Sequence, residues 1–210
     1  MDIFKLKLKI IGQIIGQIIF VIIFFSTTEA KNLDVFNKAD RVSDYFSGII
    51  LLNDNQYGEA FDFLKKLNGL EANHINFSTK YLYTLTNSGK LNEAFNYSRK
   101  LEKQKLDSFE SNLISGVFYL KNSNLKLAKK YFLKAKNKNS RFILNNYVSS
   151  SLYNWSSIKS VDINYAISEL KKLDQRFENL KKIQKVFLNC YFSSPKTNQL
   201  FIELLSNNKT

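Results

Sequence analysis

The sequence contains few of the residues that catalytic sites and tight turns require. Its 210 residues include one cysteine, one histidine and one proline, and only seven glycines. A single cysteine excludes an internal disulfide and a zinc site built from several cysteines. So few turn-forming residues argue against an all-β chain, because closely spaced strands need many tight turns. The composition therefore favours helices.

The residues that could carry chemistry stand alone in the sequence. His74 lies between two helical segments, where a surface or capping role is expected. Cys190 shares an apolar helix face with Phe187 and Tyr191, which predicts a buried structural thiol. Without a histidine nearby, such a thiol lacks the usual base of a cysteine nucleophile, and no glycine-rich phosphate loop occurs. We therefore predict no enzymatic activity, no cofactor and no metal site.

The net charge of +13 could indicate an anionic partner. However, the basic residues are 27 lysines and only 4 arginines, beside 24 asparagines, which is the bias that AT-rich codons produce. Nucleic-acid surfaces usually also use arginine for bidentate contacts, and the lysines form no block. We expect no nucleic-acid partner. Weak attraction to an anionic membrane or glycan surface stays open.

The segment 1–30 differs from the rest of the chain. Three lysines precede an apolar run over residues 10–25, and small residues then end at Ala30, which is the pattern of an export signal cut after Ala30. A helix over this run spans about 24 Å, less than the roughly 30 Å of hydrocarbon in a bilayer. A cleaved signal is the first interpretation and an uncleaved inner-membrane anchor is the second. Either one places the chain in the bacterial periplasm, after a linker over residues 31–40.

One pattern recurs at a constant interval through the middle of the chain. The stretches "QYGEAFDFLKKL" (56–67), "KLNEAFNYSRKL" (90–101) and "NLKLAKKYFLKA" (124–135) share it. Short polar turns, "NDNQ", "NSGK" and "KNSN", separate two apolar-periodic segments in each repeat, which predicts two antiparallel helices. Small residues are expected to bring the two helices close together, with Gly48 facing Ala60 and Gly116 facing Ala128. The packing positions are Gly48, Tyr57, Ala60, Leu82, Leu91, Ala94, Gly116, Leu125, Ala128 and Phe132.

These three repeats resemble the tetratricopeptide repeat, a helix–turn–helix unit whose length, about 34 residues, matches their interval. The resemblance implies an all-α fold, a right-handed solenoid of antiparallel helix pairs, with repeats at 41–74, 75–108 and 109–142. Two features of the family pattern are missing. Asp44, Ser78 and Asn112 stand where a tryptophan is usual, and no proline closes a repeat. We interpret the units as divergent repeats.

Residues 143–206 continue the pattern less regularly. Ala166 follows Ala128 at a slightly longer interval, and Leu200 follows Ala166 at the regular one, which predicts two degenerate helix pairs. We place the extra residues in "SSIKSVD" (156–162), and we expect Ser194 to cap a last helix that begins at Pro195. That helix has apolar residues behind it and no polar capping helix follows. We interpret the tail at 207–210 as the end of a fragment, or as an end that a partner covers.

The resemblance also implies a binding surface, because first helices line the inner groove of such solenoids. Its mixture of apolar, aromatic and amide side chains suits an extended or helical peptide. Trp155, the only tryptophan, is the strongest single candidate. Lys185 and Asn189 alone match the lysine–asparagine pair that some members use to bind a terminal carboxylate, so that type of clamp is not expected. The candidates are Tyr45, Ile49, Leu52, Thr79, Tyr83, Asn87, Leu113, Val117, Leu120, Tyr147, Trp155, Lys185 and Asn189.

Together these features predict an exported, non-catalytic scaffold that binds an unidentified protein or peptide in the cell envelope. Two alternatives remain. One is an assembly factor anchored in the inner membrane by residues 10–25. The other is the N-terminal part of a larger protein whose activity lies beyond residue 210.

Overall fold

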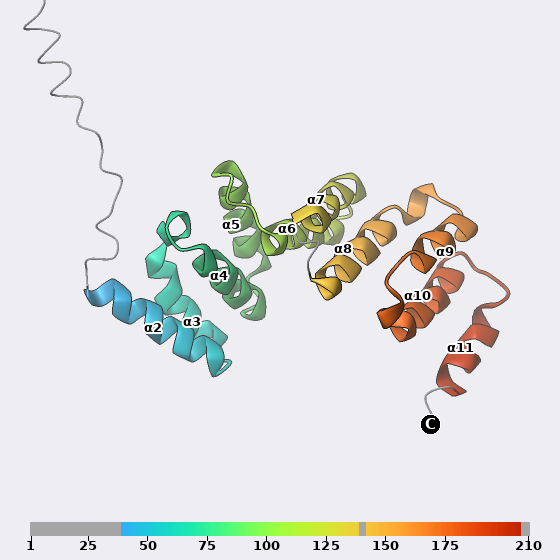
Figure 1. Cartoon of the computed structure of the whole chain (residues 1–210), viewed down its shortest axis with the longest axis horizontal. Helices are drawn as coiled ribbons and strands as arrows, with labels where there is room; N and C mark the ends of the chain where they lie inside the picture. The colour runs from blue at the N-terminus through green and yellow to red at the C-terminus, as the bar shows by residue number, and fades with distance from the viewer. Residues whose placement is uncertain (1–38, 139–141, 207–210) are drawn as a thin grey trace, which may run out of the picture. The chain divides into compact units, whose positions relative to one another are not determined.

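The computed structural model describes residues 39–138 and 142–206 (Figure 1). The chain divides into two compact parts, Met1–Val42 and Ser43–Thr210, and nearly all described residues belong to the second. Within the described residues every regular element is helical, which confirms the all-α prediction. The predicted signal, its cleavage site after Ala30 and most of the linker lie outside the described residues. Among the described residues, no helix combines the length and apolar character needed to cross a bilayer.

The helices follow one another as antiparallel pairs. Short 3₁₀ turns, Lys65–Leu67 and Leu70–Ala72, follow α3, Ile158–Ser160 follows α8 and Gln175–Phe177 precedes α10. Apart from the first two residues of α2, the helices fall within the repeats expected from the sequence. Their bounds are α2 Ala39–Asn53, α3 Tyr57–Leu64, α4 Ile75–Asn87, α5 Leu91–Lys103, α6 Phe109–Lys121, α7 Leu125–Lys138, α8 Ile143–Ser156, α9 Ile163–Lys171, α10 Glu178–Tyr191 and α11 Thr197–Ser206.

The turns inside the first three repeats share one geometry. Asn55, Gly89 and Ser123, which occupy the same position of successive repeats, have left-handed backbone angles with φ of 60°, 72° and 58°. The N–H of the next residue closes each turn on a carbonyl five residues back, as Lys90 N does on Leu85 O at 2.9 Å. This is the Schellman way of ending a helix. The predicted turns are thus confirmed, although glycine occupies the left-handed position only once.

Small residues bring the helices of a pair together, as predicted. Ala60, Ala94 and Ala128 are fully buried. A Cβ added to Gly116 would lie 2.4 Å from Cε1 of Phe132. Gly116 therefore faces Phe132, one turn beyond Ala128, and the expected pairing of Gly116 with Ala128 was wrong. Each close approach is therefore set by a small residue facing a large one.

In repeat 2 the large and the small residue of this facing pair exchange positions. Gly48 faces Leu64 in repeat 1, where an added Cβ would lie 2.6 Å from Leu64 Cδ2. In repeat 2 the larger residue, Leu82, stands at the glycine position, and the smaller residue, Ser98, stands opposite; both are buried. Each pair of positions thus combines one large residue with one small residue, as close packing requires.

Aromatic side chains pack the second helix of one repeat against the first helix of the next. Phe61 of α3 stacks on Tyr81 of α4 with ring centroids 6.3 Å apart. Phe95 of α5, at the same position one repeat later, stacks on Phe118 of α6 at 3.8 Å and meets Tyr119 edge-on at 5.3 Å. Since aromatic pairs add to the area they bury, this seam holds the repeats in register.

Lysines at one position of successive repeats join neighbouring repeats along a second seam. Lys100 Nζ donates to Asn68 Oδ1 at 2.5 Å and forms an ion pair with Glu71 of the preceding repeat. One repeat later, Lys134 forms an ion pair with Glu102, which occupies the repeat position of Asn68. The backbone N–H of Gly69 also donates to Glu71 Oε2 at 2.8 Å. Residues 68–71 and 102 thus receive a lysine from the repeat that follows.

Residues of α8, α9 and α10 form a core cluster together with the inserted segment, in the region where the sequence period loosens. Ala166 and Leu170 of α9 and Leu188 of α10 are buried together with Ile158, which the inserted segment contributes. The inserted residues thus form part of the core. The last helix begins at Thr197, so the expected start at Pro195 was wrong. Thr197 N–H and Oγ1 both donate to the carbonyl of Ser194, which makes a turn before the helix.

Candidate functional site

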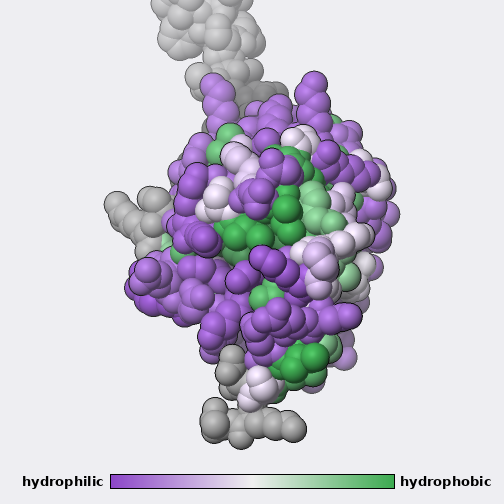
Figure 2. Space-filling view, turned by 90° about the vertical axis from the view of Figure 1, so that its right-hand side faces the viewer, coloured by the Kyte–Doolittle hydropathy of each residue, from purple (hydrophilic) through white to green (hydrophobic). Residues whose placement is uncertain are grey.

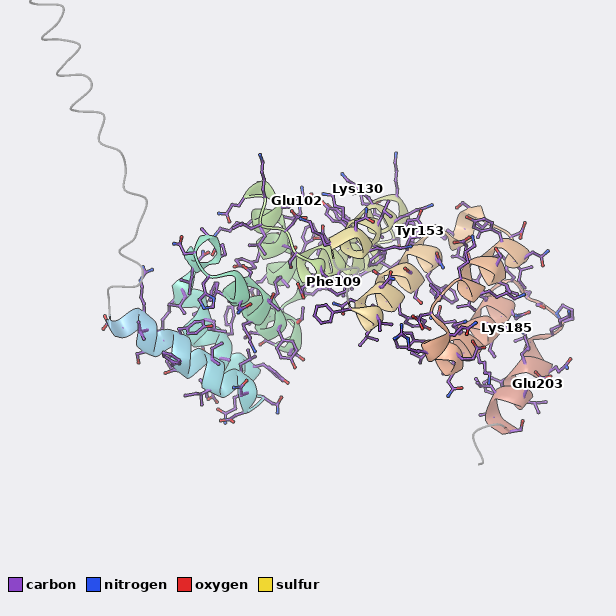
Figure 3. The ribbon with its side chains drawn as sticks, viewed as in Figure 1. Glu102, Phe109, Lys130, Tyr153, Lys185 and Glu203 are labelled. Carbon is purple, nitrogen blue, oxygen red and sulfur yellow. The ribbon has the colours of Figure 1, made fainter. Side chains whose placement is uncertain are left out.

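A hollow beside Trp155 lies where α7, α8, α9 and α10 meet. It contains about 550 Å³ of space, open solvent included. Tyr153 and Trp155 of α8 and Tyr165 of α9 supply aromatic walls, and Figure 3 labels Tyr153. We call this the Trp155 hollow; its other polar walls are Lys129, Glu169 and Gln184. A concave site with aromatic walls and a few polar groups is the usual form of a ligand or side-chain pocket.

Hydrogen bonds fix the indole ring of Trp155 in place. Its Nε1–H donates to Oε1 of Gln184 at 3.2 Å. The amide nitrogen of Gln184 donates to Tyr147 OH and to Ser151 Oγ, both at 2.8 Å. One glutamine of α10 therefore binds three side chains of α8, and it uses both ends of its amide. The hollow has a rigid wall whose polar edge is already satisfied, so the indole offers a partner its apolar surface.

The charges around the hollow differ in how far they are paired. Lys129 Nζ lies 5.0 Å from the ring centroid of Tyr153, a cation–π arrangement. Among the described residues, no carboxylate lies within ion-pair distance of Lys129. Glu169 forms an ion pair with Lys172, and the hydrogen bond to Glu169 raises the pKa of Lys172. The rim thus has one ammonium group, that of Lys129, without an ion-pair partner among the described residues, and one carboxylate, that of Glu169, which is already in an ion pair.

The walls of the hollow suit the binding of a side chain. The aromatic walls suit a bulky apolar or aromatic side chain, and Lys129 suits a carboxylate beside it. In the described residues, no three His, Cys, Asp or Glu side chains are grouped closely enough to hold a metal ion. His74 instead caps α4, since its Nδ1 accepts a hydrogen bond from Phe77 N at 3.1 Å. The predicted capping role of His74 is confirmed.

The groove candidates from the sequence fall into three classes of exposure. Three are exposed: Tyr83, Asn87 and Lys185. Seven are half-buried: Tyr45, Ile49, Thr79, Leu113, Val117, Leu120 and Trp155. Three are buried: Leu52, Tyr147 and Asn189, at 4%, 6% and 3% exposure.

The expected exposure of these three buried residues was wrong. Leu52 belongs to the core. Tyr147 packs against Phe177 with ring centroids 4.3 Å apart and accepts the hydrogen bond from Gln184. The amide of Asn189 donates to the carbonyl of Lys185 at 2.8 Å, within its own helix. The amide is therefore already used inside its helix, and the pair 185/189 does not form a carboxylate clamp.

The prediction of a buried thiol at Cys190 was also wrong. Cys190 is exposed, and its neighbours Phe187 and Tyr191 are 58% and 49% exposed. The helix α10 turns Val186 and Leu188 into the core instead. Both faces of α10 carry apolar residues, so the sequence could not show which one packs inward.

Several residues of the hollow were missed at the sequence level. Tyr165, 53% exposed, stands one residue before Ala166 and was not among the predicted site residues. Gln184 lies one turn before Leu188, which is buried. A glutamine one turn from a core position is a usable signal, because its amide must find partners when the helix packs. Trp155 carries a matching donor.

The sequence matches no known family model, and no curated protein matches it. Solved structures do match the fold. YrrB, described as a TPR protein with an unusual peptide-binding site, has a TM-score of 0.60 and 13% identity, over 85% of this chain and 92% of YrrB. The chain has the tetratricopeptide-repeat fold. A mutant form of MamA has a TM-score of 0.59 and 14% identity, over 82% of this chain and 94% of that one.

A second MamA structure, from AMB-1, gives a TM-score of 0.59 at 13% identity and covers 80% of this chain and 99% of that chain. The resemblance to the tetratricopeptide repeat that the sequence predicted is thus confirmed at the level of the fold. The divergent positions 44, 78 and 112 are compatible with it. Ser78 and Asn112 are buried at positions where the usual repeat has a tryptophan. Ser78 Oγ lies within hydrogen-bond distance of Tyr97 OH. The amide nitrogen of Asn112 donates to Asp107 and to the Ser108 carbonyl.

Proposed function

We propose that this chain is a non-catalytic scaffold that binds a peptide segment of a protein partner in the bacterial cell envelope. The observation that carries the proposal is the Trp155 hollow, a rigid aromatic site with one available ammonium, in a tetratricopeptide-repeat fold. A solved protein of the same fold, YrrB, is described as having a peptide-binding site. The aromatic walls of the hollow suit the anchor side chain of a bound peptide.

The first three repeats offer a second place for the same peptide. Tyr83 of α4 is 49% exposed, and Val117 and Leu120 of α6 are half-buried. These residues were expected to line the inner groove, and an extended peptide could contact several first helices at once. Tryptophan fluorescence can distinguish binding at the two surfaces, because only the Trp155 hollow contains the single tryptophan of the chain.

The test uses the full chain and a random peptide display library. An enriched peptide that binds in the Trp155 hollow should change the fluorescence of Trp155 directly, because no other tryptophan contributes. Tyr165→Ala and Lys129→Ala should each weaken the peptide at least about tenfold, or roughly 1.4 kcal/mol. Tyr191→Ala is the matched control. Tyr191 is 49% exposed against 53% for Tyr165, but it does not line the hollow.

The variants distinguish peptide binding in the Trp155 hollow from binding on the first three repeats and from no binding at all. Loss of binding in Tyr83→Ala with normal binding in Tyr165→Ala would move the site to the first repeats. Equal binding by the wild type, Tyr165→Ala, Lys129→Ala and Tyr83→Ala would reject both surfaces. A library that yields no peptide above background would reject peptide binding by this chain.

We also propose that residues 1–30 direct the chain to the envelope. The support is the sequence pattern of three lysines, an apolar run over residues 10–25 and small residues up to Ala30. The intact mass of the purified protein tests this. Cleavage after Ala30 leaves a chain that begins at Lys31, whereas an intact Met1 in the membrane fraction indicates an anchor. An intact chain in the soluble cytoplasm would exclude both forms of export.

A further inference from the structure

The first and the last helix of the described residues, α2 and α11, each carry an exposed apolar face. On α2, Phe46 and Ile50 are each 59% exposed. On α11, Phe201, Ile202 and Leu205 are 51%, 66% and 53% exposed. Figure 2, turned to face the side on which Figure 1 draws α10 and α11, shows hydrophobic surface framed by hydrophilic residues. Contiguous exposed apolar surface of this kind usually marks an interaction site.

The repeat period shows what each face is built to meet. Ile50 stands one repeat before Thr84 and two repeats before Phe118, the residue of α6 that stacks on Phe95. Ile50 therefore occupies the position that receives the second helix of a preceding repeat. Thr84, at the same position on α4, is fully buried. On α2 the equivalent position is open among the described residues.

The face on α11 is the matching half of the same contact. Phe201 follows Leu200 as Phe95 follows Ala94 and as Phe61 follows Ala60. Phe61 and Phe95 are the residues that stack on the first helix of the next repeat. Phe201 thus stands where a second helix contacts a following first helix, and it is exposed.

The charges near the two faces have opposite signs. Residues 39–56 contain three aspartates and one arginine, and residues 178–206 contain two glutamates and four lysines, the lysines on α10 and in the turn before α11. Asp44 is paired with Lys66, and Lys181 with Glu178, which leaves net charges of −1 and +2. Contact between two copies through the same end would place like charges together, while contact between opposite ends brings unlike charges together. The charge distribution therefore selects the head-to-tail arrangement over the two symmetric ones.

We propose that a second copy of this chain docks head to tail, with α11 of one copy packed on α2 of the next in the geometry that α5 and α6 have inside the chain. Such a heterologous contact leaves the opposite end of each copy open, so it can continue into a linear assembly. The contact would extend the aromatic seam of the repeats from one copy to the next.

Site-specific cross-linking of full-length chains tests the proposal. Two copies with different tags are co-expressed in a Cys190→Ser background, one with Ile50→Cys and the other with Phe201→Cys, and washed cells are treated with a short, membrane-permeable bismaleimide. We expect a mixed-tag dimer at a yield at least about fivefold above that of cells in which both copies carry the same substitution. High salt should lower the yield, because the charge attraction is screened.

The matched control replaces Phe201→Cys by Leu133→Cys. Leu133 is an apolar residue of a second helix, α7, and is 43% exposed, but it does not lie on a terminal face. It should give no mixed dimer with Ile50→Cys. Leu205→Glu, placed in the copy that carries Phe201→Cys, should abolish the product without affecting the fold, since Leu205 lies one turn after Phe201 on α11 and is 53% exposed. The proposal would be overturned if the mixed pair gave no cross-linked product. It would also be overturned if the mixed pair and the two same-substitution pairs gave equal yields.

Discussion

Replacing Gly116 by alanine tests whether close helix approach or helix propensity governs the stability of repeat 3. In a free helix the change should stabilise by about 0.5–1 kcal/mol, because glycine loses more backbone entropy than alanine. Here the new Cβ would lie 2.4 Å and 2.5 Å from Cε1 and Cδ1 of Phe132. Phe132 is fully buried, so its ring has no free space to enter. Inserting a methyl into a well-packed core costs about 1–3 kcal/mol.

The packing cost should exceed the propensity gain. We expect Gly116→Ala to destabilise the chain by about 1–2 kcal/mol. Urea unfolding followed by circular dichroism at 222 nm measures this. With a slope of about 1–3 kcal/mol per M, the midpoint should fall by about 0.3–2 M. Gly48→Ala should also destabilise, because a Cβ there would lie 2.6 Å from Cδ2 and 2.7 Å from Cγ of Leu64, which is fully buried.

Gly58→Ala is the matched control. Gly58 is helical and exposed, and a Cβ there meets nothing within 4 Å, so only the propensity gain of about 0.5 kcal/mol should remain. Phe132→Leu should rescue Gly116→Ala, with a favourable coupling of about 1 kcal/mol in the double-mutant cycle. If Gly116→Ala raised the midpoint as Gly58→Ala does, the close approach of α6 and α7 would not limit this repeat.

Two further predictions concern the turns and the ion pairs. Gly89→Ala places a Cβ on a backbone with φ of 72° and should destabilise the chain by about 1 kcal/mol. Ser123→Gly, at the equivalent position of the next repeat, should stabilise it by a similar amount. Urea unfolding midpoints measure both changes, and equal effects of the two variants would contradict the role of the left-handed turn. Burial opposes ionisation of Glu71, but the hydrogen bonds from Lys100 and Gly69 outweigh it and lower its pKa. A lowered pKa in the folded state gives stability that is present above the unfolded pKa of about 4.3 and is lost as pH falls through the folded pKa. The urea midpoint should therefore fall on acidification below about pH 5, and Glu71→Gln should reduce this fall; an unchanged pH profile in Glu71→Gln would show that other carboxylates account for it.

The helix pairs could be predicted from the sequence because they depend on local pattern. The turns after Asn53, Asn87 and Lys121 follow from short polar stretches at a fixed period. The alanines at 60, 94 and 128 follow from the same period and are buried as expected. In both cases each repeat supplies its own evidence, and three copies of one signal leave little freedom. The prediction that the two helices of a repeat lie close together was thus correct. The contact of Gly116 with Phe132 was not predicted.

The site could be predicted much less well, because it depends on how α10 packs against α8. Gln184 reaches Tyr147 and Ser151 only at the angle that α10 adopts, and that angle buries two of the expected groove residues. Cys190 was misplaced for the same reason, since α10 has apolar residues on more than one side. Past residue 142 the period no longer constrains the register, and periodicity alone cannot show which face of a helix is buried.

The positive charge of the chain can now be separated into two kinds of lysine. Lys66, Lys100 and Lys134, which share one position of successive repeats, each form an ion pair with an acidic residue, and the latter two bridge repeats. Lys126, Lys130 and Lys136 of α7 are exposed, and among the described residues none of them forms an ion pair. The first kind needs only a single-point contact, for which lysine serves as well as arginine. The second kind contributes three of the 13 excess positive charges and lies on α7, the helix that meets the Trp155 hollow through Lys129. An acidic peptide approaching the hollow would therefore be attracted before contact, so its association rate should depend more steeply on salt than its dissociation rate.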